Sequence, residues 1–290
     1  MGLTIITDPR CTEYAARGHP ERPERISRTV EFLKNQDKIK LAWTTPGEAS
    51  DASILRAHTR EHLEGLQSAC DFDGDTPAHP GILGHARRSA GGALAALAAA
   101  RAAGRAFSLM RPPGHHATGS RAMGFCYLNS IAIAALEAQA AGFKRVAVFD
   151  FDVHHGNGTE EILLDKPGMA FISIHQYPAY PGTGRHNRGG NCFNFPVAPG
   201  TPAEEYRAVL GRGFEELKKF RPDMVGVSAG FDAYKGDPLA DERLEAGDYQ
   251  WLGETIRNLG VPSFSVLEGG YSEELPELIF AYLRGLTGEN

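Results

Sequence analysis

Short apolar segments alternate with longer amphipathic segments along the 290 residues of this chain. Each short segment is apolar at successive positions and rich in β-branched or aromatic side chains, a pattern typical of strands buried on both faces of a parallel sheet. We predict six such strands, at residues 3–7, 107–110, 146–149, 171–174, 224–227 and 263–267.

The longer segments carry apolar residues at the three- and four-residue spacing of amphipathic helices. We predict helices at residues 21–34, 60–69, 85–102, 127–140, 203–220, 248–259 and 273–284. Alternation of strands and helices favours an α/β fold, in which a mainly parallel sheet is flanked by helices on both faces. The chain has no internal repeat and no low-complexity linker, so we predict a single domain over residues 1–290.

The composition excludes several classes of function. With 42% hydrophobic and 23% charged residues, the chain resembles an ordinary globular protein. Its net charge of −6 and the lack of long basic runs argue against a direct nucleic-acid partner. The alanine-rich run 93–100 is too short to cross a membrane, and the first residues lack the basic start of a signal peptide. We expect a cytoplasmic protein with reduced cysteines and no membrane partner, and the sequence leaves a homo-oligomer open.

Polar residues that could take part in catalysis or metal binding follow five of the predicted strands. They are His115 and His116, then Asp150, Asp152 and His154, then His175, Asp232 and Tyr271. Ligands of open parallel sheets bind at the carboxyl ends of the strands, because those ends meet at one edge of the sheet. The sequence therefore predicts one shared site.

The residues after strand 146–149 indicate a metal. In an extended segment alternate residues share a face, so Asp150, Asp152 and His154 present two carboxylates and an imidazole together. Such groups repel or stay unsatisfied unless a cation or hydrogen-bond partners lie among them. Asp152, His154 and Asp232 can supply two oxygens and a nitrogen, and a catalytic zinc site needs three protein ligands and one open position.

The histidine pair indicates acid–base chemistry beside that metal. Two carboxylate ligands neutralise Zn²⁺, so bound water is less acidified than at an all-histidine site and a separate base is expected. His115 and His116 can supply it. Asp150 and Asn157 are placed to orient them, and only the anionic Asp150 favours an imidazolium, so the two pKa values should differ. Tyr271 can donate a hydrogen bond to a carbonyl and to the oxyanion formed from it.

Other polar residues carry less specific signals. His155 and His175 we interpret as satisfied structural histidines. The acidic segment 71–75 fits two interpretations equally, a rim that attracts a cationic substrate or a solvated loop.

Several motifs stand in the order found in one known family. They are Arg111-Pro112-Pro113-Gly114-His115-His116-Ala117, Gly124-Phe125-Cys126, residues 150–159, Pro181-Gly182-Thr183-Gly184, Gly230-Phe231-Asp232 and Leu267-Glu268-Gly269-Gly270-Tyr271. With them the chain resembles the zinc-dependent histone deacetylases, a family that includes acetoin-utilisation proteins and acetylpolyamine amidohydrolases. The early motif 19–25, His-Pro-Glu-Arg-Pro-Glu-Arg, resembles the class II branch and its bacterial relatives.

The resemblance implies the arginase–deacetylase fold, a parallel sheet of about eight strands, with further edge strands near Trp43 and in residues 193–197. It implies that Asp152, His154 and Asp232 bind one catalytic zinc ion. It also implies catalytic roles for His115 paired with Asp150, for His116 paired with Asn157, and for Tyr271.

Further roles follow from the resemblance alone. Gly124, Phe125 and Tyr180 would line a narrow substrate tunnel, with Leu239 at its rim and Arg25 beside an internal channel for acetate. Residues that match a buried monovalent-cation site, usually potassium, are Asp150, Asp152, His154 and Ser173.

The implied activity is zinc-dependent hydrolysis of the amide bond in acetylated amines, either acetyl-lysine in proteins or small acetylated amines. Acetylpolyamine hydrolysis is an alternative, although Leu239 stands where polyamine-tuned relatives carry an acidic residue. A binuclear manganese ureohydrolase would need further bridging carboxylates beside Asp232. A catalytically silent binding module would be expected to lack a ligand or Tyr271, and this chain has them all.

Overall fold

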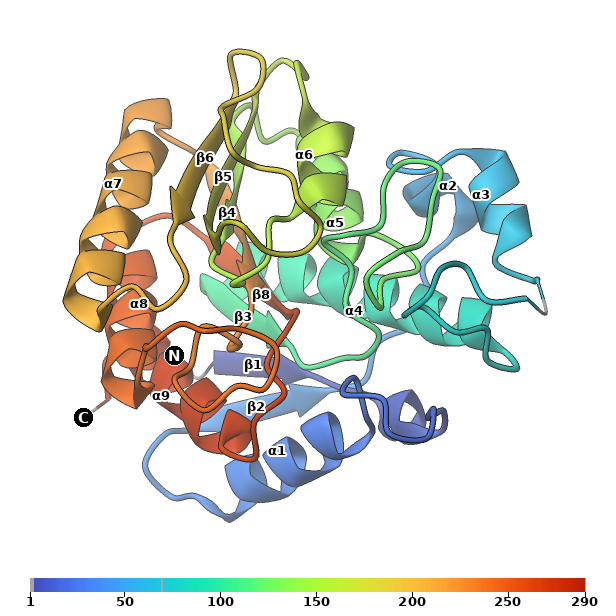
Figure 1. The fold of residues 1–290 in the computed structure, drawn as a ribbon, viewed down its shortest axis with the longest axis horizontal. Helices are drawn as coiled ribbons and strands as arrows, with labels where there is room; N and C mark the ends of the chain where they lie inside the picture. The colour runs from blue at the N-terminus through green and yellow to red at the C-terminus, as the bar shows by residue number, and fades with distance from the viewer. Residues whose placement is uncertain (1–2, 69, 290) are drawn as a thin grey trace.

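The computed structural model describes residues 3–68 and 70–289, and within them eight strands form a single sheet (Figure 1). The strands are β1 (Leu3–Ile6), β2 (Leu41–Thr44), β3 (Arg105–Ser108), β4 (Val146–Asp150), β5 (Met169–Gln176), β6 (Cys192–Val197), β7 (Met224–Ala229) and β8 (Ser263–Leu267). Their order is β2-β1-β3-β8-β7-β4-β5-β6, and every neighbouring pair is parallel. The predicted α/β class is confirmed, and the sheet is wholly parallel.

The six strands predicted from apolar runs are the six interior strands of this sheet. The two strands expected near Trp43 and in residues 193–197 are β2 and β6, which form its two edges. Edge strands leave a weaker pattern, because side chains of β2 alternate between half-buried and exposed. β6 contains Pro196, which edge strands tolerate since one side of the strand needs no ladder hydrogen bonds.

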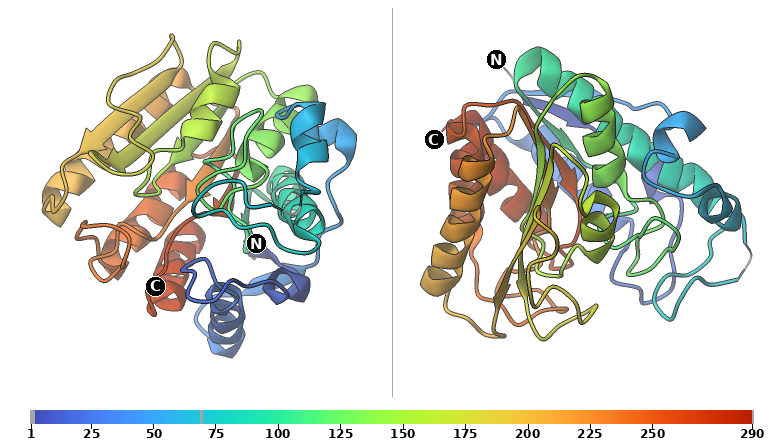
Figure 2. Two further views of the ribbon diagram at one scale, coloured as in Figure 1. Left: turned by 45° about the vertical axis from the view of Figure 1, so that its right-hand side comes forward. Right: turned by 90° about the horizontal axis from the view of Figure 1, so that it is seen from above.

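Helices cover both faces of the sheet (Figure 2). One layer contains α1 (Glu24–Asn35), α7 (Ala203–Phe220), α8 (Ala246–Asn258) and α9 (Leu275–Thr287). The other contains α4 (Ile82–Ala103), α5 (Ser130–Ala140) and α6 (Asn157–Leu163), with the short α2 (Asp51–Ile54) and α3 (Arg60–Gly65) beside them. Among residues 3–68 and 70–289, no helix has the length and apolarity that crossing a membrane requires.

The central strand β4 shows how the sequence builds the two cores. Val146 and Val148 pack into the core beneath α4 and α5, whereas Ala147 and Phe149 pack into the core beneath α7 and α8. All four side chains are fully buried. Burying each large apolar side chain contributes roughly 1.5–3 kcal/mol to folding. Because both faces of the strand are apolar, polar side chains are accommodated only beyond its carboxyl end.

Some predicted boundaries were wrong. The helix predicted at 127–140 begins at Ser130, because the side chain of Asn129 caps it by accepting the N–H of Ala132 at 3.0 Å. The strand predicted at 171–174 extends to Gln176, so His175 lies within the strand instead of after it.

The short helices α2 and α6 had no predicted counterpart. The helix predicted at 60–69 ends at Gly65, and residue 69 lies outside the described residues. α6 begins at Asn157, inside the polar motif that follows β4. At seven residues it is too short to give a clear amphipathic pattern.

Candidate metal centre and active site

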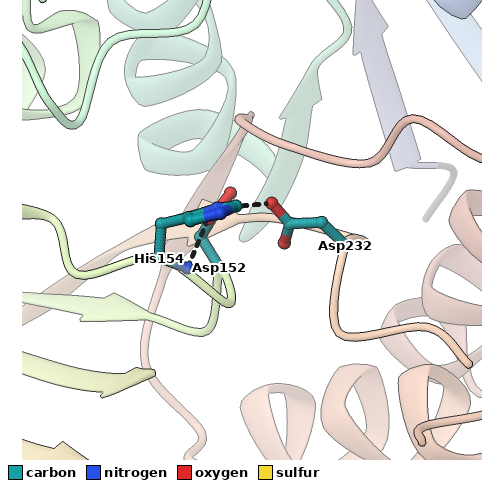
Figure 3. A group of neighbouring side chains, drawn as sticks. All are labelled: Asp152, His154 and Asp232. Atoms are coloured by element: carbon teal, nitrogen blue, oxygen red, sulfur yellow. Dashed lines mark hydrogen bonds and ion pairs between the residues drawn. The ribbon is translucent and has the colours of Figure 1, made fainter. Parts of the chain in front are cut away.

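The polar residues gather at the carboxyl ends of β3, β8, β7 and β4, which are neighbours in the middle of the sheet. Asp152 and His154 follow β4, and Asp232 follows β7. One ligand atom from each of these three lies within 4.8 Å of the others (Figure 3). The Nδ1 atom of His154 is 3.1 Å from Oδ2 of Asp232 and 3.3 Å from Oδ1 of Asp152. The structure thus brings together the three predicted metal ligands.

The chemistry of this triad fits a divalent cation. Both carboxylates are fully buried. Burial raises the pKa of Asp232, and the adjacent charge of Asp152 raises it further. Burial opposes a charge on His154, but the two carboxylates outweigh burial and raise the pKa of His154 to about 10, so the site attracts a positive charge to its centre. Two oxygens and one imidazole nitrogen are a donor set that zinc accepts.

Backbone groups hold the two carboxylates in place. Asp152 accepts the N–H of Gly269 at 2.7 Å, and Asp232 accepts the N–H of Val153 at 2.9 Å. A Cβ atom at position 269 would lie 2.1 Å from an oxygen of Asp232 and 2.6 Å from one of Asp152. Gly269 is therefore required for its backbone to approach the ligands this closely.

Asp150 stands apart from the triad. Its Oδ2 lies 3.1 Å from Nδ1 of His115, and its Oδ1 accepts the N–H of Asp152 at 3.1 Å. The strand ends at Asp150, so the simple alternation expected for Asp150, Asp152 and His154 does not continue past it. Asp150 consequently supports the histidine pair and the backbone of a ligand, while the other two residues join Asp232.

The second histidine has a neutral partner. Nδ1 of His116 lies 2.8 Å from Oδ1 of Asn157, and the amide nitrogen of Asn157 donates to the carbonyl of His116 at 3.3 Å. That amide orientation makes Oδ1 the acceptor, so Nδ1 of His116 carries the proton and Nε2 has a free lone pair. The rings of His115 and His116 lie 4.0 Å apart.

The two histidines differ strongly in proton affinity. Burial opposes a charge on His115, but the carboxylates of Asp152 and Asp150 outweigh it and raise its pKa to about 10. Burial, with repulsion from His115 and His154, lowers the pKa of His116 well below 6.5. At neutral pH the pair thus combines an imidazolium with a neutral imidazole, the asymmetry expected from their unlike partners.

These groups lie at the inner end of a cavity of about 200 Å³. Its lining residues are Asp75, Pro113, His115, His116, Gly124, Phe125, Cys126, His154, Tyr180, Leu239, Gly269 and Tyr271. All four residues predicted to line a tunnel therefore contribute to it. The side chains of Tyr180 and Leu239 are 38% and 39% exposed, which puts them at the mouth.

The wall of the cavity needs a glycine beside Phe125. Gly124 has a positive φ of 56°, and a Cβ atom there would lie 2.7 Å from the ring of His116 and 2.9 Å from that of Tyr180. Only glycine fits this position without displacing both rings.

Tyr271 lines the cavity between two ring contacts. Its ring meets Phe125 edge to face, with centroids 5.8 Å apart, and the guanidinium of Arg25 lies 4.8 Å from its centroid. Arg25 also donates to the carbonyl of Gly270 at 2.7 Å. Burial raises the pKa of Tyr271 well above 10, so its hydroxyl keeps the proton that a hydrogen-bond donor needs.

Behind Tyr271 lies a buried ion network that the sequence did not reveal. Glu21 pairs with Arg25 at 3.2 Å and accepts two hydrogen bonds from Arg111, at 2.5 and 2.8 Å. Arg111 also donates to the carbonyl of Cys11 at 2.7 Å. Glu21 is 4% exposed and Arg111 is fully buried. Both belong to motifs noted in the sequence, but no local pattern pairs residues so far apart.

Glu21→Gln should lower the free energy of unfolding by about 2–3 kcal/mol, because two buried guanidinium groups would lose their shared countercharge. Burial alone would raise the pKa of Glu21, but Arg111 and Arg25 outweigh it and lower the pKa below 4.5. Its stabilisation is therefore complete above the unfolded-state pKa and lost as pH falls through the folded-state pKa. Urea unfolding of both proteins at pH 7 and below pH 4 measures this, and an equal difference at both pH values would contradict it.

Glu268 is a second buried carboxylate that the sequence did not single out as an acid. It accepts the N–H groups of Gly114 and His115 at 2.7 and 3.1 Å, and the hydroxyl of Ser228 at 3.3 Å. Burial raises its pKa to about 7. Glu268 thereby fastens the segment that carries the histidine pair to the end of β8.

The residues of the predicted potassium site lie near one another. Ser173 is the register partner of Asp150 in the adjacent strand, and its hydroxyl lies 2.9 Å from Nδ1 of His175.

The Nε2 atom of His175 lies 3.0 Å from the carbonyl of Gly184. His155 pairs with the hydroxyl of Thr183 at 2.8 Å. Both histidines thus anchor the loop that contains Tyr180, in keeping with their interpretation as structural residues.

Comparison with known proteins accounts for this arrangement. Residues 19–285 match the histone deacetylase domain. This chain belongs to the histone deacetylase family. It is therefore an enzyme of the deacetylase and amidohydrolase type, acting on amide bonds.

Several known proteins match this chain in sequence or in structure. A probable deacetylase of Methanothermobacter thermautotrophicus is 40% identical over 303 residues, which cover 99% of this chain and 91% of the relative. The crystal structure of the HDA15 HD domain matches with a TM-score of 0.93 and 32% identity, over 99% of this chain and 91% of that one. An acetylpolyamine aminohydrolase from Burkholderia pseudomallei matches with a TM-score of 0.91 and 29% identity, over 98% of both chains. The fold is accordingly that of the arginase–deacetylase proteins.

Proposed function

We propose that this protein is a zinc-dependent deacetylase that releases acetate from acetylated amines. The observation that carries the proposal is the triad Asp152, His154 and Asp232, which lies beside His116 and Tyr271 at the inner end of one cavity. A divalent site of this kind, with a neutral imidazole and a phenol beside it, suits hydrolysis of an amide.

Asp152, His154 and Asp232 would hold the zinc ion. When bound, zinc supplies Lewis-acid polarisation of the acyl carbonyl and makes water more acidic. His116, neutral and with Nε2 unprotonated, takes a proton from the attacking water. Its Nδ1–H stays on Asn157, which keeps the ring oriented.

Tyr271 stabilises the charge that develops on the carbonyl oxygen. Its neutral hydroxyl donates a hydrogen bond to that oxygen, which becomes negative when water adds to the carbonyl carbon. The carbon–nitrogen bond then breaks, and the leaving amine takes a proton from the histidine pair. His115, held by Asp150, keeps a positive charge next to His116, which favours return of the proton from His116.

We further propose that Asp150, Asp152, His154 and Ser173 surround a potassium ion. The register pairing of Asp150 with Ser173 supports this placement. Asp150 and Asp152 belong to both the catalytic and the cation groups, so a monovalent ion there would offset part of the buried negative charge.

Acidic residues at the mouth of the cavity favour cationic substrates. Asp75 lines the cavity, and burial, followed by the adjacent Asp73, raises its pKa. The pKa of Asp73 is lowered. The pair thus retains negative charge next to the exposed rings and side chains of the rim. Acetyl-lysine peptides and acetylated polyamines both place a positive charge outside a narrow cavity, and the acidic rim favours substrates of this kind.

Zinc-loaded enzyme should release acetate from acetyl-lysine peptides and from N-acetylated polyamines, and should hydrolyse longer acyl groups less well, because the cavity is small. A kcat/KM panel over these substrates, with metal analysis of the same protein, measures this. Chelator-treated enzyme is the control and should be inactive until zinc is restored. Two manganese ions per chain with release of urea from a guanidino substrate would overturn the proposal in favour of a ureohydrolase.

A further inference from the structure

One buried carboxylate joins the inner part of the cavity to its mouth. Asp237, 7% exposed, lies in the irregular segment between β7 and α8. Its Oδ2 accepts the backbone N–H of Tyr271 at 2.7 Å, and its Oδ1 accepts the backbone N–H of Leu239 at 3.0 Å. Each carboxylate oxygen of Asp237 thus accepts one hydrogen bond, one from Tyr271 and the other from Leu239.

Tyr271 and Leu239 lie at different depths in the cavity. Tyr271 lies near the metal ligands and is 9% exposed, whereas Leu239 is 39% exposed at the mouth. The backbone N–H of Asp237 donates to the carbonyl of Tyr234 at 2.9 Å, which forms a turn in the segment that contains Asp237. Arg25 supports the same tyrosine turn from another side, through the carbonyl of Gly270. Asp237 supplies the complementary support, since it binds the N–H of the tyrosine itself.

We propose that Asp237 is a positioning residue that sets the placement of the Tyr271 hydroxyl and the placement of Leu239 at the mouth. The inference rests on the proposed deacetylation, in which the tyrosine hydroxyl stabilises the oxyanion. Because each oxygen of Asp237 accepts one of the two backbone N–H groups, the two hydrogen bonds fix both segments to the same side chain. A misplacement of about 1 Å near a reacting centre can cost roughly 100-fold in rate.

Asp237→Asn tests this at nearly constant volume. An amide has one acceptor oxygen and one donor group, so one of the two backbone N–H groups would face an NH₂ instead of an oxygen. We expect kcat on an acetyl-lysine peptide to fall roughly 10- to 50-fold, with zinc content unchanged. Asp241→Asn is the matched control, because Asp241 lies in the same segment and is exposed, and its kcat should stay within about 2-fold of the parent.

A double-mutant cycle separates positioning from general destabilisation. If Asp237 acts through the tyrosine hydroxyl, Asp237→Asn should lower kcat less than about 3-fold in the Tyr271→Phe background, where no hydroxyl is left to misplace. A second cycle with Leu239→Ala, read on KM, should show the same non-additivity for the mouth. Additive effects in both cycles would overturn the inference.

A spectroscopic readout keeps the result independent of turnover. With 3-fluorotyrosine placed at position 271, Asp237→Asn should shift or split the ¹⁹F resonance, and Asp241→Asn should leave it unchanged. If the resonance does not move, Asp237 does not position Tyr271, and this conclusion does not depend on whether the enzyme hydrolyses acetylated amines. Failure of the parent enzyme to hydrolyse any acetylated amine would be a separate result, and it would contradict the proposed function. If Asp237→Asn does not fold, Asp237→Ser, which also leaves one acceptor, is measured in its place.

Discussion

Tyr271→Phe should lower kcat for deacetylation by roughly 10²- to 10³-fold while the protein keeps one zinc ion per chain. In the proposed mechanism the change removes only the hydroxyl that donates to the developing oxyanion, and removal of one such donor typically costs about 3–4 kcal/mol in the transition state. The ring itself should stay in place. Its contacts with Arg25 and Phe125 need only an aromatic ring, and its backbone N–H still binds Asp237. The measurement is steady-state kinetics on zinc-loaded protein together with metal analysis.

A second tyrosine provides a matched control. Tyr282 is buried in the core, where its hydroxyl pairs with that of Ser265 at 2.9 Å, away from the cavity. Tyr282→Phe should keep the parent kcat and lower the free energy of unfolding by about 1 kcal/mol. Turnover of Tyr271→Phe within a few-fold of the parent would show that the phenol does not stabilise the oxyanion.

The sequence predicts the centre of this fold well because buried parallel strands leave an unambiguous pattern. A strand such as β4, with apolar residues on both faces, has few alternatives, and the polar residues directly after it must lie at the edge where ligands bind. Asp152, His154 and Asp232 could thus be assigned to one site from their positions after two strands, β4 and β7. The family resemblance then divided roles among them.

Alternation along a strand, by contrast, failed as soon as the strand ended. It suggested that Asp150, Asp152 and His154 would point the same way, but β4 ends at Asp150 and the next residues follow an irregular path. The N–H of Gly269 holds the carboxylate of Asp152, and the N–H of Val153 holds that of Asp232, so each hydrogen bond joins two segments that are far apart in the chain. A single sequence carries no local record of such contacts.

The supporting roles of Glu21 and Asp237 could not be predicted from the sequence for the same reason. Glu21 meets Arg111 across 90 positions of sequence, and Asp237 meets Tyr271 across 34. Each is an ordinary acidic residue when its neighbours in sequence are considered, since most acidic residues lie at the surface. Only the fold shows that these are buried and that their partners belong to the site.

Asp232→Asn should abolish zinc binding and lower turnover more than about 10³-fold, although it leaves the local hydrogen bonding nearly intact. The amide oxygen can still accept the N–H of Val153, which Asp232 accepts at 2.9 Å. What is lost is one of the two anionic groups in the proposed three-residue metal site, and with it much of the attraction for a dication. The comparison variant is Asp150→Asn. Asp150 pairs with His115 and lies outside the triad, so we expect that variant to lose turnover while it keeps its zinc.

Thermal unfolding of Asp232→Asn should separate the metal from the fold by its dependence on zinc. Burial raises the pKa of Asp232, so its charge opposes folding at neutral pH, but the same charge helps to raise the pKa of His154 to about 10, which favours folding. The two effects oppose each other, so the zinc-free variant should be close in stability to the zinc-free parent. Zinc at about 1,000 times its dissociation constant should stabilise the parent by about 4 kcal/mol and the variant hardly at all. The two Tm values should therefore be close without zinc and should differ clearly when zinc is added. A variant that was destabilised equally with and without zinc would instead assign Asp232 a structural role, because the loss would then be independent of the ion.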